Sequence, residues 1–198
     1  MLKLGLLWCG WCGLHSLLIT ATVRRWLEQR GGVWLGAYRL AYVGVSILTL
    51  LPLLWYTASL PQQSLPSLPL WLRVPLLLYA LVMFIGGLRV YDLQAFLGLR
   101  QWRHYRQGEA SEAPVLNTTG LLRLVRHPWY ASGLALLWGL PDLTNVTLIT
   151  RLILSAYLVI GGRLEERKMR ELLGVPYEEY CRRTPMFFPW RLRRRAQS

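Results

Sequence analysis

Long apolar blocks separated by short polar segments constrain the fold of this chain more than any other feature. Hydrophobic residues make up 54% of the 198 residues, which is high for a soluble protein. The blocks cover residues 4–22, 38–57, 70–97, 128–140 and 147–162. Because about 20 apolar residues are needed to cross a bilayer core, the pattern predicts membrane-spanning helices. The expected fold class is therefore all-α, a polytopic integral membrane protein with about five transmembrane helices.

The distribution of charge predicts how these helices are oriented. The formal net charge is +13, and nearly all Lys and Arg fall in 23–37, in 98–120 and after the last apolar block. Basic residues favour the cytoplasmic side of a membrane, so we expect the N-terminus outside and the C-terminus inside. The exceptions are Lys3, Arg73 and Arg151. Confinement of charge to connecting segments argues against a nucleic-acid-binding surface, and no nucleic-acid partner is expected.

The N-terminal block resembles a signal peptide only loosely. It is followed by Arg24 and Arg25, which favour an uncleaved helix anchored by cytoplasmic charge. Cys9 and Cys12 lie one turn apart in this block, and without further ligands they are expected to be small packing residues. Two scattered histidines are poor evidence for haem, and no metal site is expected.

The segment 122–133 stands out because two arginines and a histidine precede a proline and an apolar run. Proline fits the first turn of a helix and disfavours helix in the residue before it, so a helix is expected to begin at Pro128. Its unpaired N–H groups and partial positive charge would then lie beside Arg126 and His127. This arrangement is either an anion pocket at the membrane surface or a basic flank of a membrane span.

Two polar features lie near the ends of these spans. The fourth block reaches only about 20 Å of a roughly 30 Å core, so either its Arg126–His127 end lies below the headgroups or a distorted turn from Thr119 completes the crossing. In the third block, Arg89 and Asp92 are three residues apart and are expected to pair on one helix face. That pair either orients the helix or contacts a substrate.

The fourth and fifth blocks are joined by a short turn and should be antiparallel neighbours. Their cytoplasmic ends must then lie side by side, which places Arg126 and His127 near Arg163, Glu165 and Glu166. Two alternatives stay open. The glutamates could belong to a solvated helix with i,i+4 ion pairs. The aromatic side chains of the C-terminal segment, Tyr177, Tyr180 and Trp190, could form an interfacial belt.

Four motifs in fixed order resemble the integral-membrane isoprenylcysteine carboxyl methyltransferase and phospholipid methyltransferase superfamily. They are Arg126-His127-Pro128-x-Tyr130-x-x-Gly133, Arg163-x-Glu165-Glu166, Gly174-x-x-Tyr177-x-x-Tyr180 and Pro185-x-x-x-Pro189. The motif region covers about residues 116–190 of a single expected domain, 1–198. Further likeness to the methanethiol S-methyltransferase branch lies in Leu14-His15-Ser16-Leu17, in Tyr91-Asp92-Leu93 with Phe96-Leu97-Gly98-Leu99-Arg100-Gln101, and in Trp138-Gly139-Leu140-Pro141-Asp142. Leu122 and Leu173 depart from the aromatic residues usual at these positions.

The resemblance implies a methyltransferase that uses S-adenosylmethionine, bound between the two cytoplasmic helix ends and covered by a cytoplasmic C-terminal helix. The expected catalytic residues are Arg126, Arg163 and Glu166. The expected cofactor-binding residues are Gln101, Gly120, His127, Pro128, Tyr130, Gly133, Glu165, Glu166, Tyr177 and Tyr180. A cation beside a thiol raises its thiolate fraction, which suits Arg126 or Arg163.

The expected methyl acceptor is a small or membrane-partitioning thiol that enters from the bilayer, where membrane lipids surround the protein. An isoprenylcysteine carboxylate or a phospholipid is the alternative acceptor, and a non-catalytic membrane binding or accessory protein is the alternative function. The expected location is a bacterial inner membrane with the active site facing the cytoplasm. Neither the physiological acceptor nor the oligomeric state follows from these motifs.

Overall fold

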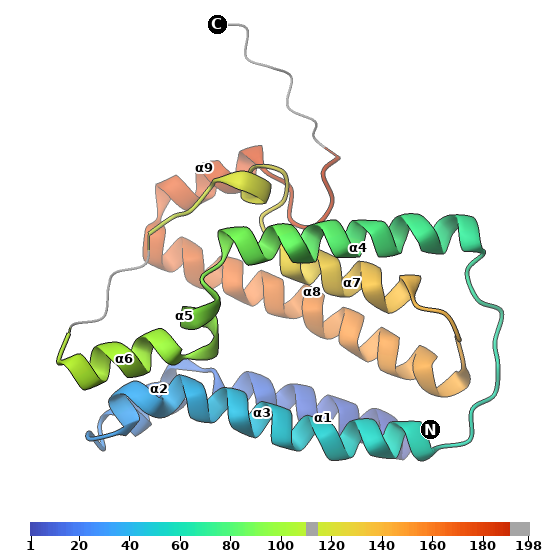
Figure 1. Cartoon of the computed structure of the whole chain (residues 1–198), viewed down its shortest axis with the longest axis horizontal. Coiled ribbons are helices and arrows are strands. Elements are labelled where there is room, and N and C mark those ends of the chain that lie inside the picture. The colour runs from blue at the N-terminus through green and yellow to red at the C-terminus, as the bar shows by residue number, and fades with distance from the viewer. Residues whose placement is uncertain (110–114, 191–198) are drawn as a thin grey trace, which may run out of the picture. The chain divides into compact units, whose positions relative to one another are not determined.

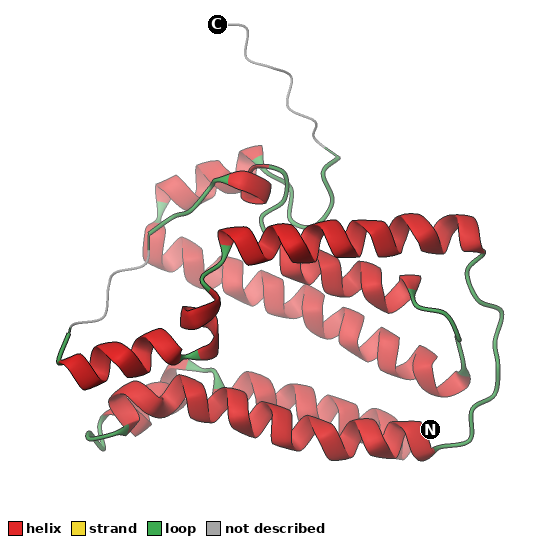
Figure 2. Cartoon of the chain, viewed as in Figure 1, coloured by secondary structure: helices red, strands yellow, loops and turns green. Residues whose placement is uncertain are grey.

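The computed structural model describes residues 1–109 and 115–190, and within these ranges the regular structure is helical (Figure 2). An isolated bridge between Ser64 and Thr144 is the one pairing of extended chain in that part. Glu112 and the basic tail of Arg191, Arg193, Arg194 and Arg195 lie outside the described residues. The all-helical fold class is confirmed.

The helices follow the apolar blocks in order (Figure 1). They are α1 (Leu2–Leu18), α2 (Ala21–Glu28), α3 (Trp34–Ser59), α4 (Leu70–Val90), α5 (Leu93–Leu97), α6 (Leu99–Gln107), the 3₁₀ turn η1 (Gly120–Arg123), α7 (Pro128–Gly139), α8 (Asn145–Leu173) and α9 (Val175–Arg183). Helices α3, α4 and α8 are long and apolar enough to cross a membrane. Helix α1 has 17 residues and α7 has 12, so both are shorter than a typical span.

The helices form two compact units. Unit 1 comprises Met1–Ser64, Asp92–Ala113 and Thr144–Ile153, and unit 2 comprises Leu65–Tyr91, Pro114–Leu143 and Leu154–Ser198. Helix α8 begins in unit 1 and continues in unit 2. The expectation of one domain over 1–198 stays a prediction.

In unit 1, helices α1 and α3 pack along each other and share polar contacts. The indole of Trp8 donates to Thr57 at 3.1 Å, that of Trp11 donates to Thr49 at 3.2 Å, and His15 lies 2.9 Å from the Ser46 hydroxyl. Such hydrogen bonds hold apolar helices together where no hydrophobic effect drives their association. These three contacts are spread along α1, so α1 pairs with α3 over most of the length of α1.

Unit 2 is built around the close packing of α4 against α7. Gly87 lies directly against the Trp129 ring, and the buried Ser132 hydroxyl donates to the Ala80 carbonyl at 2.8 Å. Met83, Val125 and Ala131 form the buried core beside this contact. Small residues let the two backbones approach, so the start of α7 is held firmly against α4.

Two boundaries differ from the sequence-based expectation. The third block does not form one helix, because α4 ends at Val90 and Tyr91 turns to extended backbone. Asp92 instead caps α5 by accepting from the Ala95 N–H, and its carboxylate pairs with Arg100. The expected pairing of Arg89 with Asp92 on one helix is therefore wrong. The fifth block and the charged segment after it form the single helix α8.

The contact between Gly87 and Trp129 yields a prediction about stability. A Cβ atom at position 87 would overlap the indole ring, so Gly87→Ala should lower the free energy of unfolding by about 1–3 kcal/mol. Thermal unfolding of the detergent-purified chain measures this change. Gly44→Ala is the matched control, because nothing lies within 4 Å of a Cβ there. Equal stability of both variants would show that α4 and α7 are not packed through Gly87.

Candidate functional site

The candidate site lies in unit 2 where α7 begins, and Pro128 is the first helical residue, as predicted. The two residues before it bond to the segment that follows α9. The Arg126 N–H donates to the Pro185 carbonyl at 2.9 Å, and the His127 N–H donates to the Met186 carbonyl at 3.1 Å. These two bonds bring the proline motif of the C-terminal segment to the base of α7.

The Arg126 side chain forms a buried ion pair with Glu166 of α8. Its Nε and its second terminal nitrogen lie 2.7 Å and 2.5 Å from Glu166 Oε1. Its remaining nitrogen donates to the Cys181 carbonyl at 3.0 Å and also to the Thr184 carbonyl. Only 9% of the Arg126 side chain and 6% of the Glu166 side chain are exposed. All three guanidinium nitrogens are therefore used to join α7, α8 and the end of α9.

Glu166 is saturated by protein groups. Its Oε1 accepts from Arg126, and its Oε2 lies 3.3 Å from a terminal nitrogen of Arg170, one turn further along α8. The i,i+4 ion pairs of the solvated-helix alternative are therefore present on α8, where Arg167 and Glu171 form a second, exposed pair. Glu166, however, faces inward and acts as a structural counter-ion.

His127 is buried and retains an unused ring nitrogen. Its Nε2 lies 3.3 Å from Glu166 Oε1, but the two atoms do not have hydrogen-bond geometry. Among the buried side-chain nitrogen and oxygen atoms of the described residues, His127 Nε2 is the one without a hydrogen-bond partner. Only 4% of the side chain is exposed. Buried polar atoms are normally satisfied, so this nitrogen is a candidate contact for a bound polar group.

Glu165 differs from its neighbour in exposure. Its Oε2 lies 3.9 Å from His127 Nδ1, and 47% of its side chain is accessible to solvent. The Tyr130 ring stands edge-on to the His127 ring, with the centroids 5.4 Å apart. The cluster of His127, Tyr130 and Glu165 therefore offers a carboxylate that a ligand can reach.

Tyrosine side chains close the cluster from two directions. The Tyr180 hydroxyl donates to the Leu122 carbonyl at 2.6 Å, and Tyr177 is buried against Tyr180 with ring centroids 5.9 Å apart. Tyr91, at the end of α4, packs on Trp129. Burial raises the pKa of Tyr91, Tyr177 and Tyr180, so all three remain neutral phenols at physiological pH. Burial of Tyr177 argues against the aromatic-belt alternative for this residue.

A depression of about 380 Å³ is lined in part by Tyr180, which binds the Leu122 carbonyl, and by Thr184, whose carbonyl binds Arg126. It lies between the segment around η1 and helix α9, and Arg123, Glu179 and Arg183 supply charge on its walls. The ion pair is buried and bound by protein groups, whereas the depression is open to a ligand.

The remaining expected site residues have other surroundings. Gly133 packs against Leu158 of α8, and Gly120 has a positive φ of 55° beside Val90. Arg163 is exposed on α8. Gln101 belongs to unit 1, where its amide donates to the Ala95 carbonyl at 3.1 Å.

The carbonyls of Cys181 and Thr184, which bind Arg126, were not predicted from the sequence. The contact of Arg170 with Glu166 is one of the i,i+4 ion pairs that the solvated-helix alternative allowed. Backbone acceptors have no sequence signature, so the two carbonyls could be found only from the structure.

The geometry supports binding of a ligand that carries both charges. Glu165 can accept from an ammonium group, and the free nitrogen of His127 with the positive end of α7 suits an anionic or hydroxyl group. The cluster holds no nucleophile paired with a base among its described members, which argues for chemistry that depends on positioning.

Comparisons with known proteins identify relatives by sequence alone, since no family model and no solved structure matches the chain. It is 28% identical to Methanethiol S-methyltransferase 1 of Bradyrhizobium diazoefficiens over 89% of this chain and 62% of that protein. It is 27% identical to Methanethiol S-methyltransferase 2 of the same organism, over 88% and 68%. It is 30% identical to Nurim of Bos taurus, over 81% and 64%.

The first of these relatives is therefore longer than the matched region, which spans less than two thirds of it. The matches nonetheless extend over most of this chain and are not confined to the motif region. The three long apolar helices and these relatives indicate an integral membrane protein. The chain is a homologue of the methanethiol S-methyltransferases and of nurim, which confirms the resemblance predicted from its motifs.

Proposed function

We propose that this protein is an S-adenosylmethionine-dependent membrane methyltransferase that methylates the sulfur of a small or membrane-partitioning thiol. The observation that carries the proposal is the similarity to proteins named methanethiol S-methyltransferase over almost nine tenths of the chain. The site geometry supports it, because a reachable carboxylate and an unsatisfied buried imidazole nitrogen stand together at the positive end of α7.

The residues present fit this cofactor. Its amino-acid part carries an ammonium group, for which Glu165 is the accessible acceptor, and a carboxylate, for which His127 and the start of α7 are suited. Tyr130, Tyr177 and Tyr180 would border it, and the depression along α9 offers room for its polar remainder. When bound, the cofactor supplies a methyl group on a positively charged sulfur.

The chain's own residues then divide into two roles. Arg126 and Glu166 are positioning residues, because each is saturated by protein groups and holds the base of α7 against α8 and α9. Arg163 is exposed and is the arginine of the motif that remains available to favour a thiolate. Transfer of a methyl group between sulfurs needs alignment more than a base, which suits this rigid site.

We further propose five membrane crossings with the N-terminus outside and the site facing the cytoplasm of a bacterial inner membrane. Helices α3, α4 and α8 are long enough by themselves. Helix α1, with 17 residues, would reach about 26 Å, and α7, with 12 residues, about 18 Å. The preceding η1 turn extends the α7 crossing, as the expectation of a distorted turn from Thr119 requires.

A second candidate function rests on the similarity to nurim, whose name specifies no reaction. A membrane binding or accessory protein would keep the buried ion pair between Arg126 and Glu166 but would need no cofactor. A carboxyl or lipid acceptor in place of the thiol is a variant of the leading proposal. Binding of S-adenosylhomocysteine would distinguish a methyltransferase from an accessory protein. A screen of acceptors would distinguish a thiol from a carboxyl or lipid acceptor.

Cofactor binding is tested by titrating S-adenosylhomocysteine into the detergent-purified chain in a calorimeter. Glu165→Gln removes the reachable carboxylate charge and should weaken binding about tenfold or more, which corresponds to roughly 1.4 kcal/mol. Glu171→Gln is the matched control, because that glutamate lies on the same helix in an exposed pair with Arg167. Equal affinity in both variants would show that the pocket lies elsewhere. Absence of binding to the folded wild type would contradict the enzymatic proposal, and labelled methyl transfer to thiols, carboxylates and lipids would identify the acceptor.

The positioning role of the ion pair is tested by a double-mutant cycle. Arg126→Met leaves a buried carboxylate without its main partner and should lower the free energy of unfolding by about 3–5 kcal/mol. Arg126→Met/Glu166→Met removes both charges and should be less destabilised than the Arg126→Met single variant. Thermal unfolding in detergent measures all three proteins, including Glu166→Met. Strict additivity of the two single changes would show that the side chains are not coupled.

Topology is tested with reporter fusions in a bacterial host. Green fluorescent protein fused after residue 198 should fluoresce, whereas alkaline phosphatase at the same position should be inactive, because five crossings place that end in the cytoplasm. Phosphatase fused after Ser64, in the segment between α3 and α4, should be active. The reverse pattern at either position would exclude the proposed orientation.

A further inference from the structure

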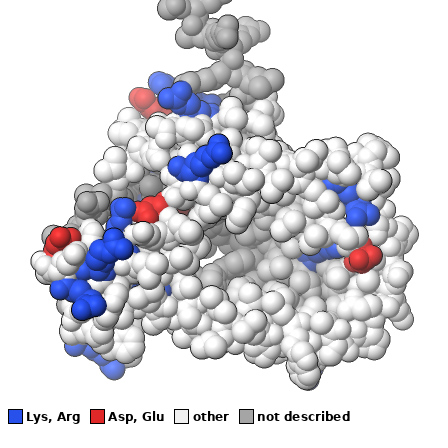
Figure 3. Space-filling view, in the orientation of Figure 1, with Lys and Arg blue, Asp and Glu red and all other residues white. Residues whose placement is uncertain are grey.

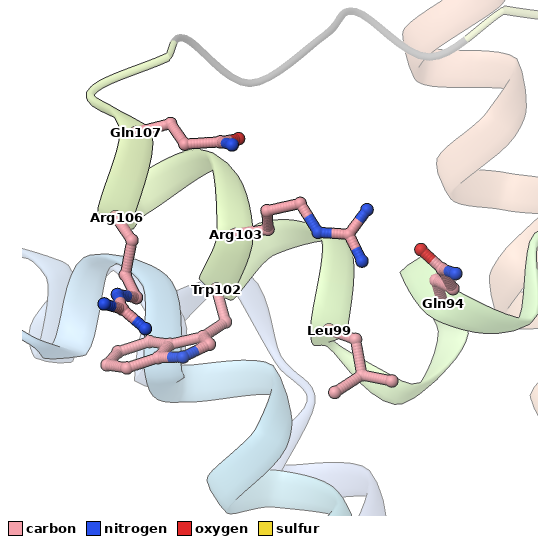
Figure 4. Close-up of a pocket in the computed structure, with 6 residues that line it drawn as sticks. All are labelled: Gln94, Leu99, Trp102, Arg103, Arg106 and Gln107. Carbon is pink, nitrogen blue, oxygen red and sulfur yellow. The ribbon is translucent and has the colours of Figure 1, made fainter.

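We propose that the α5–α6 segment of unit 1 binds the phosphate-bearing headgroup of an anionic phospholipid. A cavity of about 460 Å³ lies on this segment and is lined by Gln94, Leu99, Trp102, Arg103, Arg106 and Gln107 (Figure 4). This site is separate from the cluster at the start of α7 and does not rest on the methyltransferase proposal.

The lining residues follow the helical repeat. Those on α6 occupy positions 99, 102, 103, 106 and 107, which fall on one face of a helix. Along this face Leu99 and Trp102 come first, and the cationic side chains follow. In Figure 4 the Arg103 side chain extends toward Gln94 of α5, and Arg106 lies beside the Trp102 ring. Apolar and cationic side chains therefore line the cavity together.

The segment lies at the level of the membrane surface. Helix α5 begins at Leu93, directly after the membrane-length helix α4 ends at Val90. Helix α6 packs on the first turns of α3, where Gly36 leaves room for the Tyr105 side chain. Since α3 and α4 are each long enough to cross the bilayer, the start of α3 and the end of α4 lie at a membrane surface, which places the α5–α6 segment among the headgroups. Figure 3 shows Lys and Arg gathered over this end of unit 1 and largely uncharged surface over the apolar helices.

The arginines that line the cavity are available to a ligand. Arg100 is held by Asp92, and Arg39 donates to the Phe96 carbonyl at 3.0 Å. Arg103 and Arg106 are both exposed and, in the described part of the chain, form no ion pair. Two guanidinium groups suit the oxygens of a phosphodiester, which they can bind in a bidentate manner.

The exposed apolar side chains at the cavity favour a lipid over free phosphate. Leu99 is 44% exposed, and Phe96, on the adjoining α5, is 48% exposed. An acyl chain leaving the headgroup can cover these side chains, whereas inorganic phosphate would leave them in water. The combination of cations with exposed apolar side chains at membrane depth therefore selects an anionic phospholipid.

The proposal is tested by native mass spectrometry of the full chain in detergent, with dioleoyl phosphatidylglycerol or dioleoyl phosphatidylcholine added at equal concentration. We expect preferential retention of phosphatidylglycerol by the wild type. Arg103→Gln/Arg106→Gln should weaken that binding at least tenfold, since each arginine near a membrane surface contributes about fivefold. Arg24→Gln/Arg25→Gln removes the same charge from α2 of the same unit and should leave the binding unchanged. An equal loss in both double variants would show that binding follows net charge, which overturns the site.

Two further measurements separate the remaining outcomes. Leu99→Ser keeps both arginines and should weaken phosphatidylglycerol binding severalfold, with unfolding temperature unchanged. Should the arginine double variant fail to fold, Arg103→Lys/Arg106→Lys keeps the charge and should lower affinity by losing bidentate contacts. Added inorganic phosphate should not displace the lipid. Displacement at equimolar phosphate, or equal retention of phosphatidylcholine, would overturn the lipid assignment.

Discussion

The candidate site depends on the buried ion pair between Arg126 and Glu166. A buried charge is tolerated only when it is paired and its remaining hydrogen-bonding atoms are satisfied, and here the guanidinium also binds the Cys181 and Thr184 carbonyls. The start of α7, the inner face of α8 and the end of α9 are thereby fixed to one group. Because His127 and Glu165 directly adjoin the two paired residues in the chain, the pair helps to set the separation between them.

The same pair explains why two adjacent glutamates differ. One step along a helix turns a side chain by about 100°, so Glu166 points inward while Glu165 points toward solvent. Both oxygens of Glu166 are occupied, by Arg126 and by Arg170, which leaves Glu165 as the carboxylate that a cation can reach. The His127 ring lies near both glutamates, with Nδ1 3.9 Å from Glu165 and the unsatisfied Nε2 3.3 Å from Glu166.

Local rules were sufficient to predict part of this arrangement. The proline at position 128 predicts the start of α7, and a short turn between two apolar blocks predicts that Arg126 and Glu166 approach each other. Tertiary packing determined features that local rules did not predict, including where helices continue and where they end. Helix α8 runs without a break through Gly161 and Gly162, which leave room for Tyr130 and for Met186 with Phe187. The break after Val90 lies inside the third block, where the mean hydropathy does not mark it and Asp92, a residue type favoured at helix N-caps, is the local signal.

In a chain with a net charge of +13, composition does not identify which arginines bind ligands. Arg126 belongs to the most specific motif, yet every one of its nitrogens is occupied by the protein. Arg103 and Arg106 belong to no motif, but they are exposed on one helix face beside apolar side chains. The difference follows from solvation: a buried cation must be neutralised by the fold, whereas an exposed one retains its charge for a partner. Saturation of contacts, which only the structure reveals, therefore distinguishes a positioning arginine from a ligand-binding one.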